Sequence, residues 1–266
     1  MSDSVLHDTD TRGIATLTFN RPEKHNAFDD VLIAELTAKL LQLNNDKNVR
    51  IVILTGAGKS FSAGADLNWM RSMAKFSEDE NIEDALKLAE LMDILNTLRK
   101  PTIARINGAV YGGGVGLVAC CDIAIAADTA KFALSEVRLG LVPSVISPYV
   151  IAAIGAHQAR RYFLTAETIG AQQAQNIGLV HEVMPADKLD EAVGKEVDLL
   201  LKAGPKALTA CKELIAANAA ASVSVRRALK QKTAQLIAQL RVSNEGQEGL
   251  SAFLEKRPPK WIKEPK

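Results

Sequence analysis

At 266 residues, with 47% hydrophobic and 24% charged side chains, the chain has the composition of a soluble globular protein of one large or two small domains. Its net charge of +1 argues against nucleic acid as the main partner, because that binding depends on an excess of basic residues. No apolar run reaches the length that spans a bilayer, and the polar N-terminus is unlike a signal or transit peptide, so we expect a cytoplasmic protein.

The cysteines and histidines give no sign of a metal site. None of the three cysteines and four histidines has the spacing of metal ligands. Adjacent Cys120 and Cys121 lie in an apolar run, which predicts reduced core thiols and a reducing compartment. We therefore expect no bound metal.

The N-terminal part of the chain alternates between predicted strands and helices. Three segments have the apolar composition of strands: residues 13–19, 51–55 and 102–106. The second is apolar on both faces, as in a parallel sheet that is covered on both sides. Two segments have the periodicity of helices: residues 31–43, with Asp29 or Asp30 as the N-cap, and residues 78–98, stopped by Pro101. The apolar face of the second consists of Ile82, Leu86, Leu88, Leu91, Ile94, Leu95 and Leu98.

Farther along the chain, helices dominate. The apolar run at residues 115–121 predicts a buried helix, and residues 122–126 predict a short buried strand. Residues 166–178 are predicted to be helical and residues 179–183 to form a strand, and helical periodicity then continues from 187 to about 254. Strand–helix alternation followed by helices predicts a parallel α/β sheet domain with a helical C-terminal part.

Two glycine-rich loops, each placed after a predicted strand, are the candidate functional segments. Residues 62–66, SAGAD, form the first. Gly112, Gly113 and Gly114 form the second and begin the predicted helix, where backbone N–H groups lack partners and the helix dipole favours negative charge. Two such donors that converge on one point can stabilise an oxygen that gains charge during a reaction.

Glu136 ends the apolar segment FALSE and is the candidate acid. Burial raises the pKa of a carboxyl group, which makes it a better proton carrier at neutral pH. A glycine triplet or a single Glu also occurs in purely structural roles. In combination, the two loops and Glu136 form a specific candidate for a catalytic site.

Segments spread over most of the chain resemble the enoyl-CoA hydratase/isomerase (crotonase) superfamily. In chain order they are NRPEKHNAF, GKSFSAGADL, INGAVYGGGVGLVACCDIAIAADTAKFALSEVRLGLVP, IGLVHEV and FLEKRPPKW. The resemblance implies an α/β fold built as a crotonase-like spiral of ββα turns, with residues 1–200 as the core. It implies that residues 201–266 form a helical region that drives assembly into a homotrimer, or into a hexamer made of two trimers.

The resemblance also implies roles for individual residues. The backbone N–H groups of Ala65 and Gly113 would form an oxyanion hole for the thioester carbonyl oxygen, and Glu136 would carry protons. CoA is then part of the substrate. The positions expected to contact the CoA or acyl part are Lys24, Ala27, Ala63, Gly64, Asp66, Leu67, Gly112 and Gly116.

Two departures from the family pattern concern the acyl pocket. Hydratases with two catalytic carboxylates have a Glu two residues after the glycine triplet, where this chain has Gly116. Many relatives have a glycine-rich PGAGGTQ stretch, where this chain has PSVISPY. Val145 and Ile146 in that stretch therefore either face the substrate or pack in the core, and the same alternatives hold for Trp69 and Met70.

Within the superfamily, GGGVGLVACCDIAIA and the later FALSEVRLGLVPSVISPYV are most similar to bacterial methylglutaconyl-CoA hydratases of leucine breakdown, followed by carboxygeranoyl-CoA hydratases. Those bacterial sequences also have glycine at the position of Gly116. The implied reaction is syn addition of water to the α,β double bond of a branched, carboxylated acyl-CoA, or its reverse. Either Glu136 handles all protons or a substrate carboxylate helps, and Arg138 either pairs with such a carboxylate or is simply solvated.

Two alternatives remain open. A single Glu at this position is also typical of the Δ3-Δ2 enoyl-CoA isomerases of the family, which move one proton and need no activated water. Mammalian methylglutaconyl-CoA hydratases also bind RNA through a lysine-rich helix, and basic residues cluster here in one predicted helical region: Arg226, Arg227, Lys230 and Lys232. The low net charge favours a solvated face over an RNA-binding role.

Overall fold

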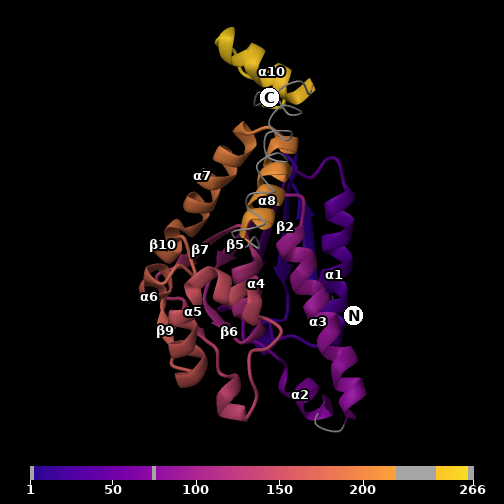
Figure 1. Ribbon diagram of the computed structural model, residues 1–266, viewed down its shortest axis with the longest axis vertical. Coiled ribbons are helices and arrows are strands. Elements are labelled where there is room, and N and C mark those ends of the chain that lie inside the picture. Colours follow the sequence, from indigo (N-terminus) through magenta and orange to yellow (C-terminus); the bar gives the residue numbers. More distant parts are fainter. Residues whose placement is uncertain (1–2, 74–75, 220–243, 263–266) are drawn as a thin grey trace.

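Two β-sheets form the centre of the protein (Figure 1). The computed structural model describes residues 3–73, 76–219 and 244–262. The larger sheet contains, in spatial order, β1 (Val5–Thr9), β2 (Ile14–Phe19), β3 (Ile51–Gly56), β5 (Thr102–Ile106), β7 (Ile123–Ala127) and β10 (Glu182–Met184). The smaller sheet contains β4 (Ser60–Ser62), β6 (Ala109–Tyr111), β8 (Lys131–Ala133) and β9 (Ile169–Gly170). The β1–β2 and β8–β9 pairs are antiparallel, and the other pairs are parallel.

Helices surround the two sheets, and the last of them lies beyond one end of the sheets (Figure 1). They are α1 (Asp30–Asn45), α2 (Leu67–Met73), α3 (Glu78–Thr97), α4 (Gly113–Cys120), α5 (Ser147–Thr165), α6 (Ala171–Asn176), α7 (Leu189–Lys202), α8 (Pro205–Ala219) and α10 (Asn244–Leu254). α1 and α3 lie side by side, and α2 lies near the N-terminal end of α3 (Figure 1). Asp29, one of the two predicted caps, accepts a hydrogen bond from the Leu32 N–H and begins α1.

The chain repeats one unit three times: a strand in the larger sheet, a strand in the smaller sheet, and then a helix. The units are β3, β4 and α2–α3; β5, β6 and α4; and β7, β8 and α5. The strands of both sheets follow one another in the same order, because each unit lies beside the preceding one. This arrangement confirms the predicted α/β spiral of ββα turns.

The central strands are buried on both faces, as their composition predicts. Val52 and Leu54 of β3 belong to the larger core, together with side chains of α1, α3 and α4. Ile51 and Ile53 point to the other face, where they pack in a second core with residues of α7 such as Val193. Successive side chains of β3 therefore alternate between the two hydrophobic cores, one on each face of the larger sheet.

Several predicted boundaries are wrong. The helix predicted from residue 166 begins only at Ala171, because Ala166 has a left-handed backbone (φ 49°) and Ile169 pairs with β8. The strand predicted at residues 179–183 is shifted to β10. The strand β1 was not predicted from its polar sequence, nor were the three-residue strands β4 and β6.

The described part of residues 201–266 is helical and contains α8 and α10. Lys212 of α8 lies 2.6 Å from the Asp122 carboxylate at the start of β7. Glu245 of α10 accepts hydrogen bonds from the backbone N–H groups of Lys206 and Ala207 in the first turn of α8. The basic cluster at residues 226–232 lies outside the described residues, so its predicted role stays a prediction.

Candidate active site

Three neighbouring parallel strands, β4, β6 and β8, end at the same edge of the smaller sheet. The chain leaving β4 enters residues 63–65, the chain leaving β6 enters Gly112 and Gly113, and the chain leaving β8 leads to Glu136. The carboxyl ends of adjacent parallel strands lie together, and ligands of α/β proteins commonly bind there. The topology therefore brings together the two glycine loops and the acid that the sequence singled out.

The two glycine loops touch each other. Gly64 (φ 85°) and Gly112 (φ 50°) both have left-handed backbone angles that favour glycine. A Cβ added to Gly64 would lie 3.0 Å from the Tyr111 carbonyl oxygen and 3.7 Å from Gly112 Cα. Any side chain at Gly64 would therefore push the loops apart.

Phe28, just before α1, holds both loops. Its N–H donates to the Gly64 carbonyl oxygen at 2.6 Å, and its carbonyl oxygen accepts from the Asp66 N–H at 2.7 Å. The backbone on both sides of Ala65 is therefore fixed. The Phe28 ring lies against Gly113, because a Cβ added there would come within 2.7 Å of a ring carbon.

The N–H groups of Ala65 and Gly113 are available for a ligand. Neither donates a hydrogen bond to any part of the protein that the structure describes. Gly113 is the first residue of α4, where the helix dipole is positive. Both residues line one cavity, so their N–H groups can act on an oxygen that gains negative charge there.

Glu136 lies beside Gly112 in the same cavity. Its Oε1 atom would be 3.3 Å from a Cβ added to Gly112. Its Oε2 atom is buried and has no hydrogen-bond partner among the described residues. Burial raises the pKa of the Glu136 carboxyl, and a hydrogen bond with its own backbone opposes only part of that rise. Such a carboxyl is suited to accept and return a proton.

The cavity that joins these groups has a volume of about 410 Å³. Its other walls are mostly apolar and come from α2, α3 and the segment before α5: Leu67, Trp69, Met70, Met73, Ala85, Leu88, Leu139, Leu141, Val142, Pro143, Val145 and Ile146. Of the alternatives left open by the sequence, the pocket position therefore holds for Trp69, Met70 and Val145. Ile146 does both, because it lines the cavity and is also a buried residue of the core. The polar residues Asn81, Asp84, Ser135 and Ser144 complete the lining.

Gly116 lies behind the cavity wall and not on it. A Cβ added to Gly116 would lie 2.3 Å from Ile146 Cγ2 and 3.2 Å from Met92 Cε. Ile146, which is 3% exposed, thus occupies the space into which a Glu at position 116 would project. The structure therefore assigns Gly116 a packing role in place of the predicted substrate contact.

Lys24 and Asp66, both predicted to contact CoA, bind each other at 3.0 Å. Asp66 is only 7% exposed, and Arg21 lies between it and Asp29. Burial would raise the pKa of Asp66, but hydrogen bonds from Lys24 and from two backbone N–H groups of α2 outweigh burial and lower it. This cluster fixes the start of α2 directly after Ala65.

The predicted CoA and acyl contacts therefore fall into two groups. Four line the cavity: Ala63, Gly64, Leu67 and Gly112. Four do not: Lys24, Ala27, Asp66 and Gly116. Arg138, a candidate partner for a substrate carboxylate, is exposed and also lies outside the lining.

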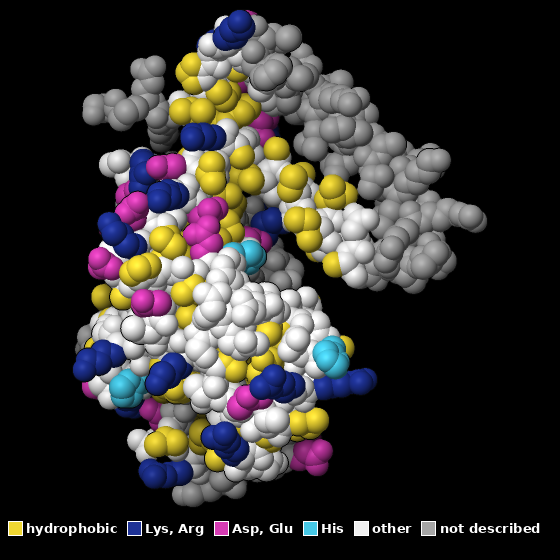
Figure 2. Space-filling model, turned by 90° about the vertical axis from the view of Figure 1, so that its left-hand side faces the viewer, with side chains coloured by type: hydrophobic (Ala, Val, Ile, Leu, Met, Phe, Trp, Pro, Cys, Tyr) yellow, Lys and Arg dark blue, Asp and Glu magenta, His cyan; other side chains and the backbone are white. Residues whose placement is uncertain are grey.

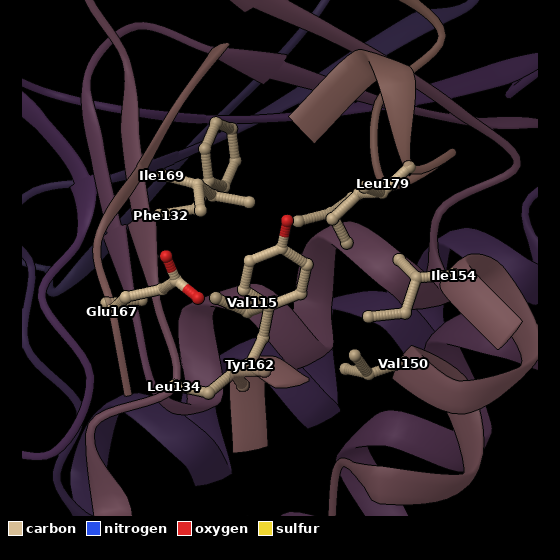
Figure 3. Close-up of a pocket in the computed structure, with 11 residues that line it drawn as sticks. Val115, Phe132, Leu134, Val150, Ile154, Tyr162, Glu167, Ile169 and Leu179 are labelled. Atoms are coloured by element: carbon tan, nitrogen blue, oxygen red, sulfur yellow. The ribbon is translucent and has the colours of Figure 1, made fainter. Parts of the chain in front are cut away.

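A second cavity lies behind the active-site strands, between α4, α5 and β9 (Figure 3). Its volume of about 20 Å³ suits a single water molecule and not an acyl group. Apolar side chains such as Val150, Ile154 and Leu179 surround it, and the Tyr162 hydroxyl points into it and accepts a hydrogen bond from Gln173. We interpret this cavity as a packing defect of the core.

The described residues contain no group of three or more His, Cys, Asp or Glu side chains that could hold a metal ion. Cys120 and Cys121 are buried and unpaired, and burial raises the pKa of the Cys121 thiol to about 12. Among the helices that the structure describes, none combines the length and apolar character that crossing a membrane would require.

The site and the spiral fold agree with comparisons to known proteins. The enoyl-CoA hydratase/isomerase family model matches residues 9–264, which is nearly the whole chain. The chain belongs to this family. An acyl-CoA thioester is a substrate that fits this family.

Curated relatives and solved structures match this family member along almost their full lengths. A putative enoyl-CoA hydratase of Thermus thermophilus is 33% identical over 93% of this chain and 97% of its own. The 2,3-dehydroadipyl-CoA hydratase of Escherichia coli is 34% identical over 92% of this chain and 94% of its own. The structure of a putative enoyl-CoA hydratase/isomerase from Legionella pneumophila is 46% identical, with a TM-score of 0.91, 98% of this chain covered and 99% of the other.

Phe28 and Asp84 are among the lining residues that sequence reasoning missed. Phe28 was not assigned, because an aromatic residue before a helix is indistinguishable from ordinary core. Asp84 was not assigned, because the predicted apolar face of α3 included Ile82 and Leu86, which are 50% and 61% exposed. The signal that points to Asp84 is the stripe Leu88, Leu91 and Leu95, which continues one turn earlier at position 84.

The raised pKa of Glu136 predicts a pH-dependent effect of Glu136→Gln on stability. Ionised Glu136 is destabilising in the folded state, because its pKa there lies above the ordinary value of 4.5. We expect Glu136→Gln to unfold at a higher urea concentration than the parent at about pH 8, with the difference shrinking toward about pH 4. Exposed Glu90→Gln is the control, and an equal pH dependence in both variants would contradict the prediction.

The contact between Gly116 and Ile146 predicts an unusual effect of Gly116→Ala. Glycine to alanine inside a helix ordinarily stabilises by up to about 1 kcal/mol, but here the overlap with Ile146 should cost about 1–3 kcal/mol. Urea denaturation should show that Gly116→Ala is less stable than the parent. The double variant Gly116→Ala/Ile146→Ala should lose less stability than the sum of the two single variants.

Gly194→Ala in α7 is the matched control, because a Cβ there meets no atom within 4 Å. We expect this variant to be as stable as the parent or more stable. Equal stability changes at positions 116 and 194 would show that Ile146 does not restrict position 116.

Proposed function

We propose that the protein is a hydratase that adds water to the α,β double bond of an acyl-CoA thioester. The observation that carries this proposal is that Ala65, Gly113 and the half-buried Glu136 line one cavity, and that neither backbone N–H donates to a residue that the structure describes. Acyl-CoA chemistry of this family requires stabilisation of an enolate oxygen and a group that moves protons. The cavity offers both.

In the proposed mechanism, the thioester carbonyl oxygen accepts hydrogen bonds from Ala65 and Gly113, which polarises the conjugated double bond. Ionised Glu136 takes a proton from water as the water oxygen bonds to the β-carbon. The electrons of the double bond move toward the carbonyl oxygen, and the resulting enolate is held by the two N–H groups. Protonated Glu136 then delivers its proton to the α-carbon, on the same face.

One carboxylate therefore serves as base and then as acid. The position at which two-carboxylate hydratases have their other Glu is Gly116 here, and Ile146 fills the adjoining space. The raised pKa of Glu136 favours this dual role, because the protonated carboxyl becomes easier to form as the pKa rises toward the ambient pH.

For the substrate, we propose a branched, carboxylated enoyl-CoA of the methylglutaconyl type, as formed in leucine degradation. The support is the sequence likeness between GGGVGLVACCDIAIA and the methylglutaconyl-CoA hydratases. Additional support comes from the relative in Escherichia coli, whose name, 2,3-dehydroadipyl-CoA hydratase, gives an acyl group that ends in a carboxylate.

A second candidate function is that of a Δ3-Δ2 enoyl-CoA isomerase. The observation that favours it is the contact between Gly116 and Ile146. Because Ile146 fills the space beside Gly116, position 116 cannot supply the second Glu of the two-carboxylate hydratases. An isomerase needs only to move one proton between two carbons, and a single carboxyl beside an oxyanion hole is sufficient for that.

We further propose that the protein acts as a cytoplasmic homotrimer or hexamer and uses no cofactor beyond the CoA of its substrate. Support for assembly comes from large apolar side chains exposed on α7 and α8: Leu199, Leu214 and Ile215. Figure 2 shows hydrophobic side chains gathered on the upper half of one face, where these helices lie. Such surfaces on a small protein favour contact with another chain.

A substrate panel tests the proposed function: crotonyl-, 3-methylcrotonyl-, 3-methylglutaconyl-, carboxygeranoyl- and 3-enoyl-CoA. Water addition is measured as the loss of the enoyl absorbance. We expect it to be fastest with 3-methylglutaconyl-CoA. Glu136→Gln should lower kcat at least about 100-fold with little change in KM, because the proton carrier is lost and the binding surface is kept.

Circular dichroism would verify that Glu136→Gln is folded, and Glu90→Gln serves as the exposed control on α3. Near-normal turnover by Glu136→Gln would refute its catalytic role. Turnover of the 3-enoyl compound alone would replace the hydratase by the isomerase.

A further inference from the structure

One carboxyl group of the cavity has no role in the proposed mechanism. The core-facing stripe of α3 contains Leu95, Leu91 and Leu88, and its next position toward the N-terminus is Asp84. Asp84 is only 8% exposed, whereas its neighbour Leu86 is 61% exposed. A charged residue thus occupies a place where helix periodicity calls for an apolar one. Its burial destabilises the fold unless its carboxyl group finds a partner.

The protein itself satisfies Asp84 only in part. Within the ranges that the structure describes, its carboxyl forms no ion pair. Burial raises the pKa of Asp84, with a further rise from Asp30, and the opposing effects of Lys87 and the Trp69 side chain do not cancel it. The protonated form that burial favours can both donate and accept a hydrogen bond.

Asp84 lies on a different turn of α3 from the residue that contacts α4. Met92 of the same helix touches the site of Gly116, which is close to the oxyanion loops in α4. Asp84 precedes Met92 by two helical turns, which corresponds to about 12 Å along the axis of α3. The other polar residue of α3 that lines the cavity is Asn81. Its Nδ2 already donates hydrogen bonds to backbone oxygens between α2 and α3.

We propose that Asp84 is a specificity-determining residue that hydrogen-bonds an oxygen-bearing group of the acyl chain, away from the thioester. The class of substrate is an acyl-CoA whose chain carries a carboxyl or hydroxyl group. This inference rests on the proposed acyl-CoA function. Apolar residues such as Leu88 and Val145 line the adjoining walls. An acyl chain without such an oxygen would therefore desolvate the Asp84 carboxyl further and add no hydrogen bond to the one that it shares with the Trp69 side chain.

Binding of saturated analogues tests this proposal without requiring turnover. Glutaryl-CoA has a terminal carboxyl group, and butyryl-CoA does not. Isothermal titration calorimetry with the full chain would give the ratio of the two affinities for the parent, Asp84→Leu, Asp84→Ala and Asp84→Asn. Asp93→Asn is the matched control, because Asp93 is an exposed aspartate on the same helix.

We expect Asp84→Leu and Asp84→Ala to lower the preference for glutaryl-CoA about tenfold, as for one hydrogen bond to a charged group. Asp84→Asn should keep the preference within about threefold, because an amide can still donate, and Asp93→Asn should not change it. If Asp84→Leu does not fold, Asp84→Ala decides, because a smaller side chain cannot overpack the helix.

Three outcomes would overturn the assignment of Asp84. One is an unchanged preference in Asp84→Ala, and another is an equal loss of affinity for both analogues, which would show a structural role. The third is loss of crotonyl-CoA hydration in Asp84→Asn with binding intact, which would make Asp84 a catalytic residue. Failure of the parent protein to bind either analogue would instead refute the acyl-CoA function itself.

Discussion

Parallel pairing of the three short strands β4, β6 and β8 is the constraint on which the rest of the site depends. Each has only three residues, yet their pairing sets the relative positions of both glycine loops and of Glu136. The order β4, β6, β8 follows the order β3, β5, β7 in the larger sheet. The strand order of the larger sheet thus determines that of the smaller sheet. The smaller sheet in turn positions the two glycine loops and Glu136.

Close packing then fixes the backbone at Ala65 and Gly113, which carries the two proposed N–H donors. Gly113 has no space for a side chain because the Phe28 ring covers it, and Phe28 also fixes the backbone around Ala65. The same residue therefore ties together two loops that belong to different turns of the spiral. Donors held in this way need little reorganisation when an oxygen gains charge, which is the main source of catalytic stabilisation in such sites.

Much of the fold was predictable from the sequence, because long elements show their periodicity. The strand β3 and the helices α1 and α4 were predicted almost as the structure has them, and the glycine loops were found because glycine has few competing explanations in such runs. The strands β4 and β6 were missed because three residues cannot display an alternation. Glu136 was found because the family resemblance and the preceding apolar run pointed to it.

Contacts between distant residues could not be predicted. The spacing of α3 placed Ile82 inside and gave no weight to Asp84, because the hydrophobic periodicity of its first two turns is ambiguous. Lys24 and Asp66 were expected to face CoA, which stays a prediction, but the ion pair between them was not foreseen. The filling of the space beside Gly116 by Ile146 depends on volumes that meet only in the folded chain.

The interlocking of Gly116 and Ile146 constrains how this enzyme could diverge. A Glu at position 116 would need a smaller residue at position 146, because the Ile146 side chain fills the space beside Gly116 in the close packing between α4 and the start of α5. The two positions are therefore epistatic, and the order of substitution matters. A lineage that changed the glycine first would pass through a poorly folding ancestor, whereas one that shortened the isoleucine first would carry a cavity that a later carboxylate could occupy.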